Sequence, residues 1–272
     1  MERFITGNKF KALANYTFAP LQKRGDDYYN LPNTYNPEKI KNGDIIYTDT
    51  GYAGEFLELV KRLDKQIVLI THNGDTCINI APPDNVIKWY TQNVNISHPR
   101  IESIPIGLEN DIWFPERHKK EKIIAKVKEP RKYRNLVYMN FSIATNPIRP
   151  RLYQIYEDEP WVTSVRGSNG MGRFDEYLDN VYNHKFMLCP EGNGIDVHQP
   201  WECMYVGTIP IQRRNFNNRF YTDLPICFVD NWEDLTEDFL LSEFKRIKSG
   251  VWNLEKLTFE YWKNKILNYE SK

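Results

Sequence analysis

Residues 186–211 read Phe186-Met-Leu-Cys-Pro-Glu-Gly-Asn-Gly-Ile-Asp-Val-His-Gln-Pro-Trp-Glu-Cys-Met-Tyr-Val-Gly-Thr-Ile-Pro-Ile211, and this stretch decides the fold. Its apolar start predicts a strand that ends at Pro190, because proline has no N–H for a sheet ladder. A glycine turn follows, and then a short helix with Pro200 in its first turn and Gly207 at its end. A second strand closes the segment. Open α/β sheets bind nucleotides and phosphates at such a junction of strand and helix.

The same alternation of strand and helix extends outward in both directions. Gln66-Ile-Val-Leu-Ile-Thr71 is apolar on consecutive residues, which is typical of a strand buried on both faces of a parallel sheet. The pattern restarts at Asn135-Leu-Val-Tyr-Met-Asn140, after a charged run over residues 116–134 that predicts a surface helix and linker. We therefore predict an α/β fold of two Rossmann-type halves in tandem. Residues 1–40 are expected to be mostly irregular surface chain, and residues 85–93 to form a short helix.

These patterns predict three parts of the chain. Residues 1–130 are expected to form an N-terminal α/β domain, and residues 131–252 a second α/β domain that carries the glycine turn. Residues 253–272 are expected to form a terminal helix that packs back on the first domain.

Composition excludes several classes of protein. The 272 residues are 41% hydrophobic, enough for a normal core, and the 36 basic residues balance the 36 acidic ones. No global field therefore indicates nucleic acid as a partner. No run approaches the 18 apolar residues of a transmembrane segment. The four cysteines form no C-x-x-C pair, which favours a reduced, cytoplasmic protein.

Polar side chains gather at the predicted helix start. Asp196 is placed to cap the helix, and His198 and Glu202 are four residues apart and share one face. In a nucleotide-sugar pocket, Glu202 would accept hydrogen bonds from ribose hydroxyls, and the amides of Gly192-Asn193-Gly194 would hold phosphate or sugar oxygens. The alternative is an N-capped helix with a surface His–Glu pair. A glycine pair alone does not separate the two interpretations.

The segment resembles the donor-binding segment of exostosin-like glycosyltransferases, and more broadly the acidic-residue helix of GT-B glycosyltransferases. The family pattern runs C-P-x-G-x-G-x-D-x-H-R-x-W-E-A-L and then G-x-x-P-I. Gln199 stands here for the usual arginine, and Cys203-Met204 for Ala-Leu. The resemblance is looser elsewhere over residues 40–240, at Ile70-Thr-His-Asn-Gly-Asp75, Ile104-Pro-Ile-Gly-Leu-Glu109 and Thr145-Asn-Pro-x-Arg149. The matching positions are Cys189, Pro190, Gly192, Gly194, Asp196, His198, Trp201, Glu202, Gly207, Pro210 and Ile211.

The resemblance implies a GT-B-like fold with a cleft between the halves, and transfer of a sugar from a nucleotide-sugar donor to a saccharide or other hydroxyl acceptor. It places the donor on the second half at Gly192, Asn193, Gly194, Asp196, His198 and Glu202. Arg149 and Arg166 follow turns in the second half and are candidate diphosphate contacts, since the arginine fork suits phosphate. They would replace the arginine missing at position 199.

His72 and Asp75 follow a strand of the first half, where the acceptor would lie. An inverting transferase needs a base to take the acceptor proton, and either side chain fits that role. An Asx-type turn closing the connection is the alternative. The sequence leaves open whether the anomeric configuration is retained or inverted.

Several absent motifs narrow the chemistry. No D-x-D triplet follows a hydrophobic strand, so we expect a metal-independent reaction with no cofactor beyond the nucleotide-sugar substrate. A nucleotide-binding oxidoreductase is disfavoured because G-x-G-x-x-G is absent. A non-catalytic sugar- or nucleotide-binding protein on a degenerate transferase scaffold remains the main alternative, and Gln199 favours it.

Overall fold

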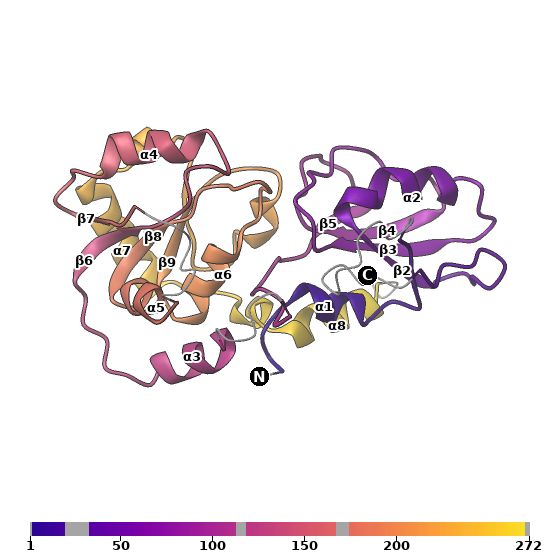
Figure 1. Ribbon diagram of the computed structural model, residues 1–272, viewed down its shortest axis with the longest axis horizontal. Coiled ribbons are helices and arrows are strands. Elements are labelled where there is room, and N and C mark those ends of the chain that lie inside the picture. The colour runs from indigo at the N-terminus through magenta and orange to yellow at the C-terminus, as the bar shows by residue number, and fades with distance from the viewer. Residues whose placement is uncertain (1, 20–32, 113–117, 167–173, 270–272) are drawn as a thin grey trace.

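The computed structural model describes residues 2–19, 33–112, 118–166 and 174–269. The chain forms two α/β halves, each around a parallel five-stranded sheet, which lie side by side (Figure 1). The last strand of the first sheet ends at Ser103 and the first strand of the second begins at Asn135. The division into domains near residue 130 stays a prediction.

The first sheet has its strands in chain order, all parallel. Alternate residues of its strands point to opposite faces, as the pleat requires. One face buries Ile46, Leu69 and Trp89 under helix α2 (Ala53–Val60). The other face carries α1 (Gly7–Lys11) and α8 (Phe259–Leu267), side by side in Figure 1. The strands are β1 (Tyr16–Thr17), β2 (Ile45–Asp49), β3 (Ile67–His72), β4 (Val86–Thr91) and β5 (Ile101–Ser103).

The second sheet has the order β10-β9-β8-β6-β7. Counted within this half, the order is 2-1-3-4-5, so the chain changes direction across the sheet between β6 and β8. One face packs on α4 (Ile148–Tyr156) and α7 (Glu237–Ser249), and the other on α5 (Phe174–Tyr182) and α6 (His198–Tyr205). The strands are β6 (Asn135–Met139), β7 (Val162–Ser164), β8 (His184–Leu188), β9 (Ile209–Arg213) and β10 (Cys227–Val229).

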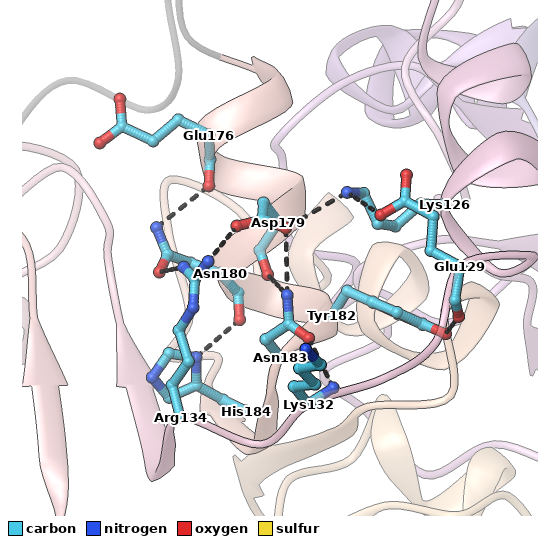
Figure 2. A network of polar contacts seen from close by, with 10 residues as sticks. All are labelled: Lys126, Glu129, Lys132, Arg134, Glu176, Asp179, Asn180, Tyr182, Asn183 and His184. Atoms are coloured by element: carbon cyan, nitrogen blue, oxygen red, sulfur yellow. Dashed lines mark hydrogen bonds and ion pairs between the residues drawn. The ribbon is translucent and has the colours of Figure 1, made fainter.

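Helix α3 (Lys119–Lys126) is held against α5 by a polar network (Figure 2). The Asp179 carboxylate accepts hydrogen bonds from Lys126 Nζ at 3.2 Å and from Arg134 Nη2 at 2.6 Å. Asn183 Nδ2 donates to the same carboxylate, and Tyr182 Oη donates to Glu129 O. The charged run thus forms a docked helix whose first residue, Lys119, lies at the pocket described below.

Helix α6 belongs to the core of both halves. Its Trp201 and Met204 side chains pack in one buried cluster with residues of the first sheet and with Trp262 and Ile266 of α8. Tyr205 Oη accepts a hydrogen bond from Ile5 N at 3.0 Å. The helix therefore cannot move without disturbing the first half.

Two expectations about secondary structure are wrong. Residues 85–93 contain β4 rather than a helix, because Val86-Ile-Lys-Trp-Tyr-Thr91 is, apart from Lys88, made of β-branched and aromatic residues that favour a pleated surface. Residues 1–40, expected to be mostly irregular surface chain, contain α1 and β1, and Phe4 and Ile5 among them are fully buried. Phe10 of α1 is fully buried against the first sheet, so tertiary contact stabilises this five-residue helix. Within the described residues, no helix has the length and apolar character needed to cross a membrane.

Truncating Trp262 should destabilise the protein strongly. Its side chain is 1% exposed in the core beneath the first sheet, so Trp262→Ala should lower the free energy of unfolding by about 3–5 kcal/mol. Denaturant unfolding measures this. Leu267→Ala, in the same helix but 47% exposed, should change it by less than about 0.5 kcal/mol. Equal losses in the two variants would mean that α8 does not form part of this core.

Candidate functional site

A pocket of about 250 Å³ lies where the second sheet reverses its strand order. The chain leaving β6 supplies Thr145 and Arg149, and the chain leaving β8 supplies the glycine turn. Open α/β sheets bind ligands outside the carboxyl ends of strands at such a reversal. The lining residues are Asp75, Ile106, Glu109, Lys119, Thr145, Arg149, Phe174, Tyr177, Gly192, Asn193, Gly194, Asp196, Val197, His198, Gln199 and Glu202.

The glycine turn is packed closely between the two halves. A Cβ atom on Gly194 would lie 2.9 Å from the Asn93 side chain, and one on Gly192 would lie 3.1 Å from Arg149 Nη2. Neither glycine has a positive φ, so close approach of neighbouring side chains, rather than backbone strain, favours glycine at both positions. Asn193, between them, is exposed at the pocket.

Asp196 does not cap helix α6, contrary to expectation. The N-cap is Val197, and no side chain caps the helix. The Asp196 carboxylate instead accepts from Ile106 N at 2.8 Å and from Trp201 Nε1 at 2.9 Å, which ties the turn to the first half. Burial raises the pKa of Asp196 to about 7 despite these hydrogen bonds. Asp196 is 4% exposed, which leaves little of its carboxylate to bind a donor.

Glu202 has two protein partners at the pocket. Its Oε1 accepts from Lys119 Nζ at 2.7 Å, and its Oε2 accepts from Tyr177 Oη at 2.7 Å. Lys119 Nζ also lies 2.9 Å from Glu109 Oε2 of the first half. A carboxylate has about four lone-pair sites, so Glu202 can still accept a hydrogen bond from a ligand.

The charges of this cluster stabilise one another. Burial alone would raise the pKa of Glu202, but the Lys119 ammonium and the Tyr177 hydroxyl hold that pKa below its ordinary value. Burial alone would lower the pKa of Lys119, but Glu202 and Glu109 raise it above its ordinary value. Lys119 is therefore a cation inside the pocket. No sequence pattern marks Lys119 as a site residue, because it stands in the charged run predicted to lie at the surface; only its contact with Glu202 distinguishes it.

The two candidate arginines occupy different places. Arg149 lines the pocket and is 5% exposed. Its guanidinium donates to the backbone oxygens of Glu191 at 2.8 Å, Ser142 at 3.1 Å and Pro190 at 3.1 Å. It therefore shapes the turn and contributes charge, while much of its donor capacity is used.

Arg166 does not line the pocket. It is exposed and pairs with Glu157 through Nε at 2.7 Å. Residues 167–173, which follow it in the chain, lie outside the described part of the structure. The structure therefore does not bring Arg166 together with the other predicted donor contacts.

A second pocket, of about 350 Å³, adjoins the first on the side of the first half. Four residues line both: Asp75, Ile106, Glu109 and His198. The remaining lining residues of the second pocket are Gly7, Asp49, His72, Asn73, Gly74, Gln92, Leu108 and Asn110.

His72 is unsuited to the role of base that the sequence assigned to it. Its side chain is 1% exposed, its Nε2 lies 3.1 Å from Pro105 O, and its Nδ1 accepts from Asn73 N at 2.7 Å. Both ring nitrogens are thus engaged. Burial lowers the pKa of His72 to about 4. Asp75, by contrast, is exposed, and its role as a base stays a prediction.

Gln199 stands where the family pattern has arginine, and its side chain is hydrogen-bonded to the backbone. Its Nε2 donates to Asn140 O at 2.6 Å. Its Oε1 is buried and has no partner among the described residues, and the same holds for Thr145 Oγ1. Both residues line the first pocket. Within the described ranges, no group of three or more His, Cys, Asp or Glu side chains is placed to hold a metal ion.

No protein-family model matches the chain, and no curated protein matches its sequence. Three solved structures are similar in part. An α1,3-fucosyltransferase is 14% identical with a TM-score of 0.40, over 86% of this chain and 71% of that one. The catalytic domain of starch synthase IV from Arabidopsis thaliana, bound to ADP and acarbose, is 11% identical with a TM-score of 0.36, over 84% and 73%. The pneumococcal O-GlcNAc transferase GtfA, with UDP and GlcNAc, is 8% identical with a TM-score of 0.37, over 86% and 58%.

Similarities this low carry no argument about function. The two parallel sheets and the helices that flank them give the chain an α/β architecture of two halves. Its likeness to the GT-B fold stays a prediction. The exostosin-like resemblance stays a prediction.

His72 should make stability fall as the solution becomes acidic. Its folded-state pKa lies below that of an unfolded histidine, so its contribution is complete above about pH 6.5 and is lost as pH falls towards 4. His72→Gln keeps an amide donor for Pro105 O and removes the titration. Denaturant unfolding at pH 7 and pH 4.5 should therefore show a smaller acid-induced loss in this variant than in the wild type. The control His118→Gln, at an exposed position, should lose as much stability on acidification as the wild type. The same loss in His72→Gln would mean that His72 is not the source of the acid-induced change.

Removing Lys119 should leave Glu202 as an unpaired buried charge. Lys119→Met should lower the free energy of unfolding by about 3–5 kcal/mol, and combining it with Glu202→Gln should recover part of that loss. Lys120→Met is the matched control because its partner, the Asp111 side chain, is 70% exposed, and its cost should stay below about 1 kcal/mol. If the loss of stability in the double variant equals the sum of the losses in the two single variants, Lys119 and Glu202 are not coupled.

Proposed function

We propose that the protein transfers a sugar from a nucleotide-sugar donor to a saccharide or other hydroxyl acceptor, without a metal ion, and that it is related to the exostosin-like glycosyltransferases. The observation that carries the proposal is a pocket at the strand-order reversal of the second sheet that adjoins another pocket on the side of the first half. The first is lined by the glycine turn, the start of α6 and Glu202. The second adjoins it on the side of the first half. A transfer reaction needs two such compartments that share a boundary.

The donor fits the first pocket on chemical grounds. Glu202 accepts hydrogen bonds from ribose hydroxyls, while the positive end of α6 and the Arg149 charge stabilise the departing nucleoside diphosphate. The two unpartnered buried oxygens, Gln199 Oε1 and Thr145 Oγ1, are acceptors that hydroxyl groups of a bound ligand satisfy. Such acceptors favour a ligand rich in hydroxyl groups.

The acceptor fits the second pocket. Asp49, Asp75 and Glu109 line it together with the amide side chains of Asn73 and Asn110. Carboxylates and amides are the groups that bind sugar hydroxyls. A cytoplasmic setting belongs to the same proposal, and it agrees with the four free cysteines.

A binding protein without activity is the second candidate. It is favoured by the guanidinium of Arg149, whose bonds go to backbone oxygens, and by Gln199 at the position of the missing arginine. Calorimetry with UDP-, GDP- and ADP-sugars, followed by turnover assays over a panel of saccharide acceptors, separates the two. Binding with turnover supports the transferase, and binding without turnover supports the second candidate. No binding by any donor contradicts both the transferase and a nucleotide-binding scaffold.

Glu202→Gln should weaken binding of the preferred nucleoside diphosphate by about 1–3 kcal/mol, because the ribose hydroxyls lose a charged acceptor. Glutamine keeps an acceptor for Tyr177 and a similar shape. Calorimetry measures the change, and Glu121→Gln, on the exposed side of α3, is the matched control. The same affinity in Glu202→Gln and the wild type would remove Glu202 from the donor site.

A further inference from the structure

His198 lies where the two pockets meet. It is the first residue of α6, in the second half, and it lines both the donor pocket and the acceptor pocket. A group at this boundary is within the space where an acceptor hydroxyl and a donor sugar would come together. The position of His198 does not by itself define a role, but the tautomer of its imidazole ring does.

The His198 ring is held in one tautomer. Its Nδ1 lies 2.8 Å from Gly107 O, and a carbonyl oxygen only accepts, so Nδ1 carries the hydrogen. In the neutral imidazole, Nε2 then holds a lone pair. Nε2 makes no hydrogen bond to any residue in the described ranges. The side chain thus presents a proton acceptor at the boundary of the pockets.

The Gly107 carbonyl that orients His198 is itself held in a fixed direction by the backbone around it. Gly107 has a φ of 65°, and a Cβ atom there would lie 2.4 Å from Ile5 O. Leu108 N donates to the same Ile5 oxygen at 2.9 Å. Only glycine fits this position, so the N-terminal segment fixes the direction of the Gly107 carbonyl. A side chain of the second half is thereby aligned by the backbone of the first.

We propose that His198 is the general base of the transfer reaction, an inference that rests on the proposed function. Nε2 removes the proton from the acceptor hydroxyl as its oxygen bonds to the anomeric carbon of the donor. The bond from that carbon to the diphosphate oxygen breaks, and the nucleoside diphosphate leaves with the electron pair. This direct displacement inverts the anomeric configuration. In this mechanism His72 takes no part in the reaction, and Asp75 is not the base.

Charged groups of both halves lie around His198. The carboxylates of Asp75 and Glu109 line the same two pockets, and Glu202 lies one helical turn along α6. The Lys119 ammonium pairs with Glu109 and Glu202, and burial keeps His72 neutral. The other ionisable side chains that line the pockets are Asp49, Arg149, Tyr177 and Asp196.

The variant His198→Asn tests the role, because the asparagine amide can still donate to Gly107 O while no basic nitrogen remains. With a nucleotide sugar that the wild type binds, we expect kcat/KM for nucleoside diphosphate release, measured with water or a saccharide as acceptor, to fall roughly 10²- to 10⁴-fold. Affinity for the nucleoside diphosphate should stay within about twofold, which is under 0.5 kcal/mol. The acidic limb of the wild-type pH profile should disappear from the residual activity.

Three further variants sharpen the test. His198→Ala should regain activity when free imidazole is added, which a merely structural role would not produce. His98→Asn, away from both pockets, should keep wild-type turnover. Asp75→Asn should keep the acidic limb of the pH profile. Loss of that limb in Asp75→Asn instead of in His198→Asn would overturn the proposal. Denaturant unfolding of each variant excludes loss of fold as the cause.

The remaining outcomes are distinguishable. Unchanged turnover in His198→Asn overturns the proposal while leaving the proposed function intact. Weaker nucleotide binding with unchanged kcat also overturns it and assigns His198 to the donor. If the wild type binds nucleotide sugars but transfers none of them, even to water, the protein is a binding scaffold and has no base. If it binds none, the proposed function fails first, and the role of His198 fails with it.

Discussion

The contact between the start of α6 and residues 106–107 of the first half is the constraint on which the site depends. Asp196 accepts from Ile106 N, and two residues later His198 donates to Gly107 O. These bonds join the segment that carries the second half's pocket to the backbone of the first half. Because Gly107 lies against Ile5 O, the N-terminal segment that precedes α1 takes part as well. The two pockets share a wall for this reason.

Burial at this contact has an electrostatic cost that the structure offsets locally. Asp196 is removed from water and its pKa rises to about 7, so its charge is only partly retained near neutral pH. Glu202, equally buried, keeps its charge because Lys119 and Tyr177 contact it. Two carboxylates six residues apart therefore differ in protonation because of their partners, not because of their depth.

Much of the architecture could be predicted from the sequence. Consecutive apolar residues such as Gln66–Thr71 predicted buried parallel strands, and the glycine turn predicted the junction of β8 and α6 correctly. The prediction failed at residues 85–93, where β-branched and aromatic residues form β4 instead of the expected helix. It also failed for α1, because a five-residue helix has almost no local signal and is stabilised by Phe10 in the core.

The sequence by itself determined the order of elements and the cluster of polar residues at the start of α6, since period, turn residues and spacing are local properties. It placed His198 and Glu202 on one face, and both line the pocket. Only the tertiary structure decided the roles of their neighbours. The ring of His72 has both nitrogens engaged, whereas His198 Nε2 has no partner in the part of the chain that the structure describes. The difference depends on backbone oxygens that are distant in the chain. Lys119 reaches Glu202 across 83 residues, and no local pattern specifies such a contact.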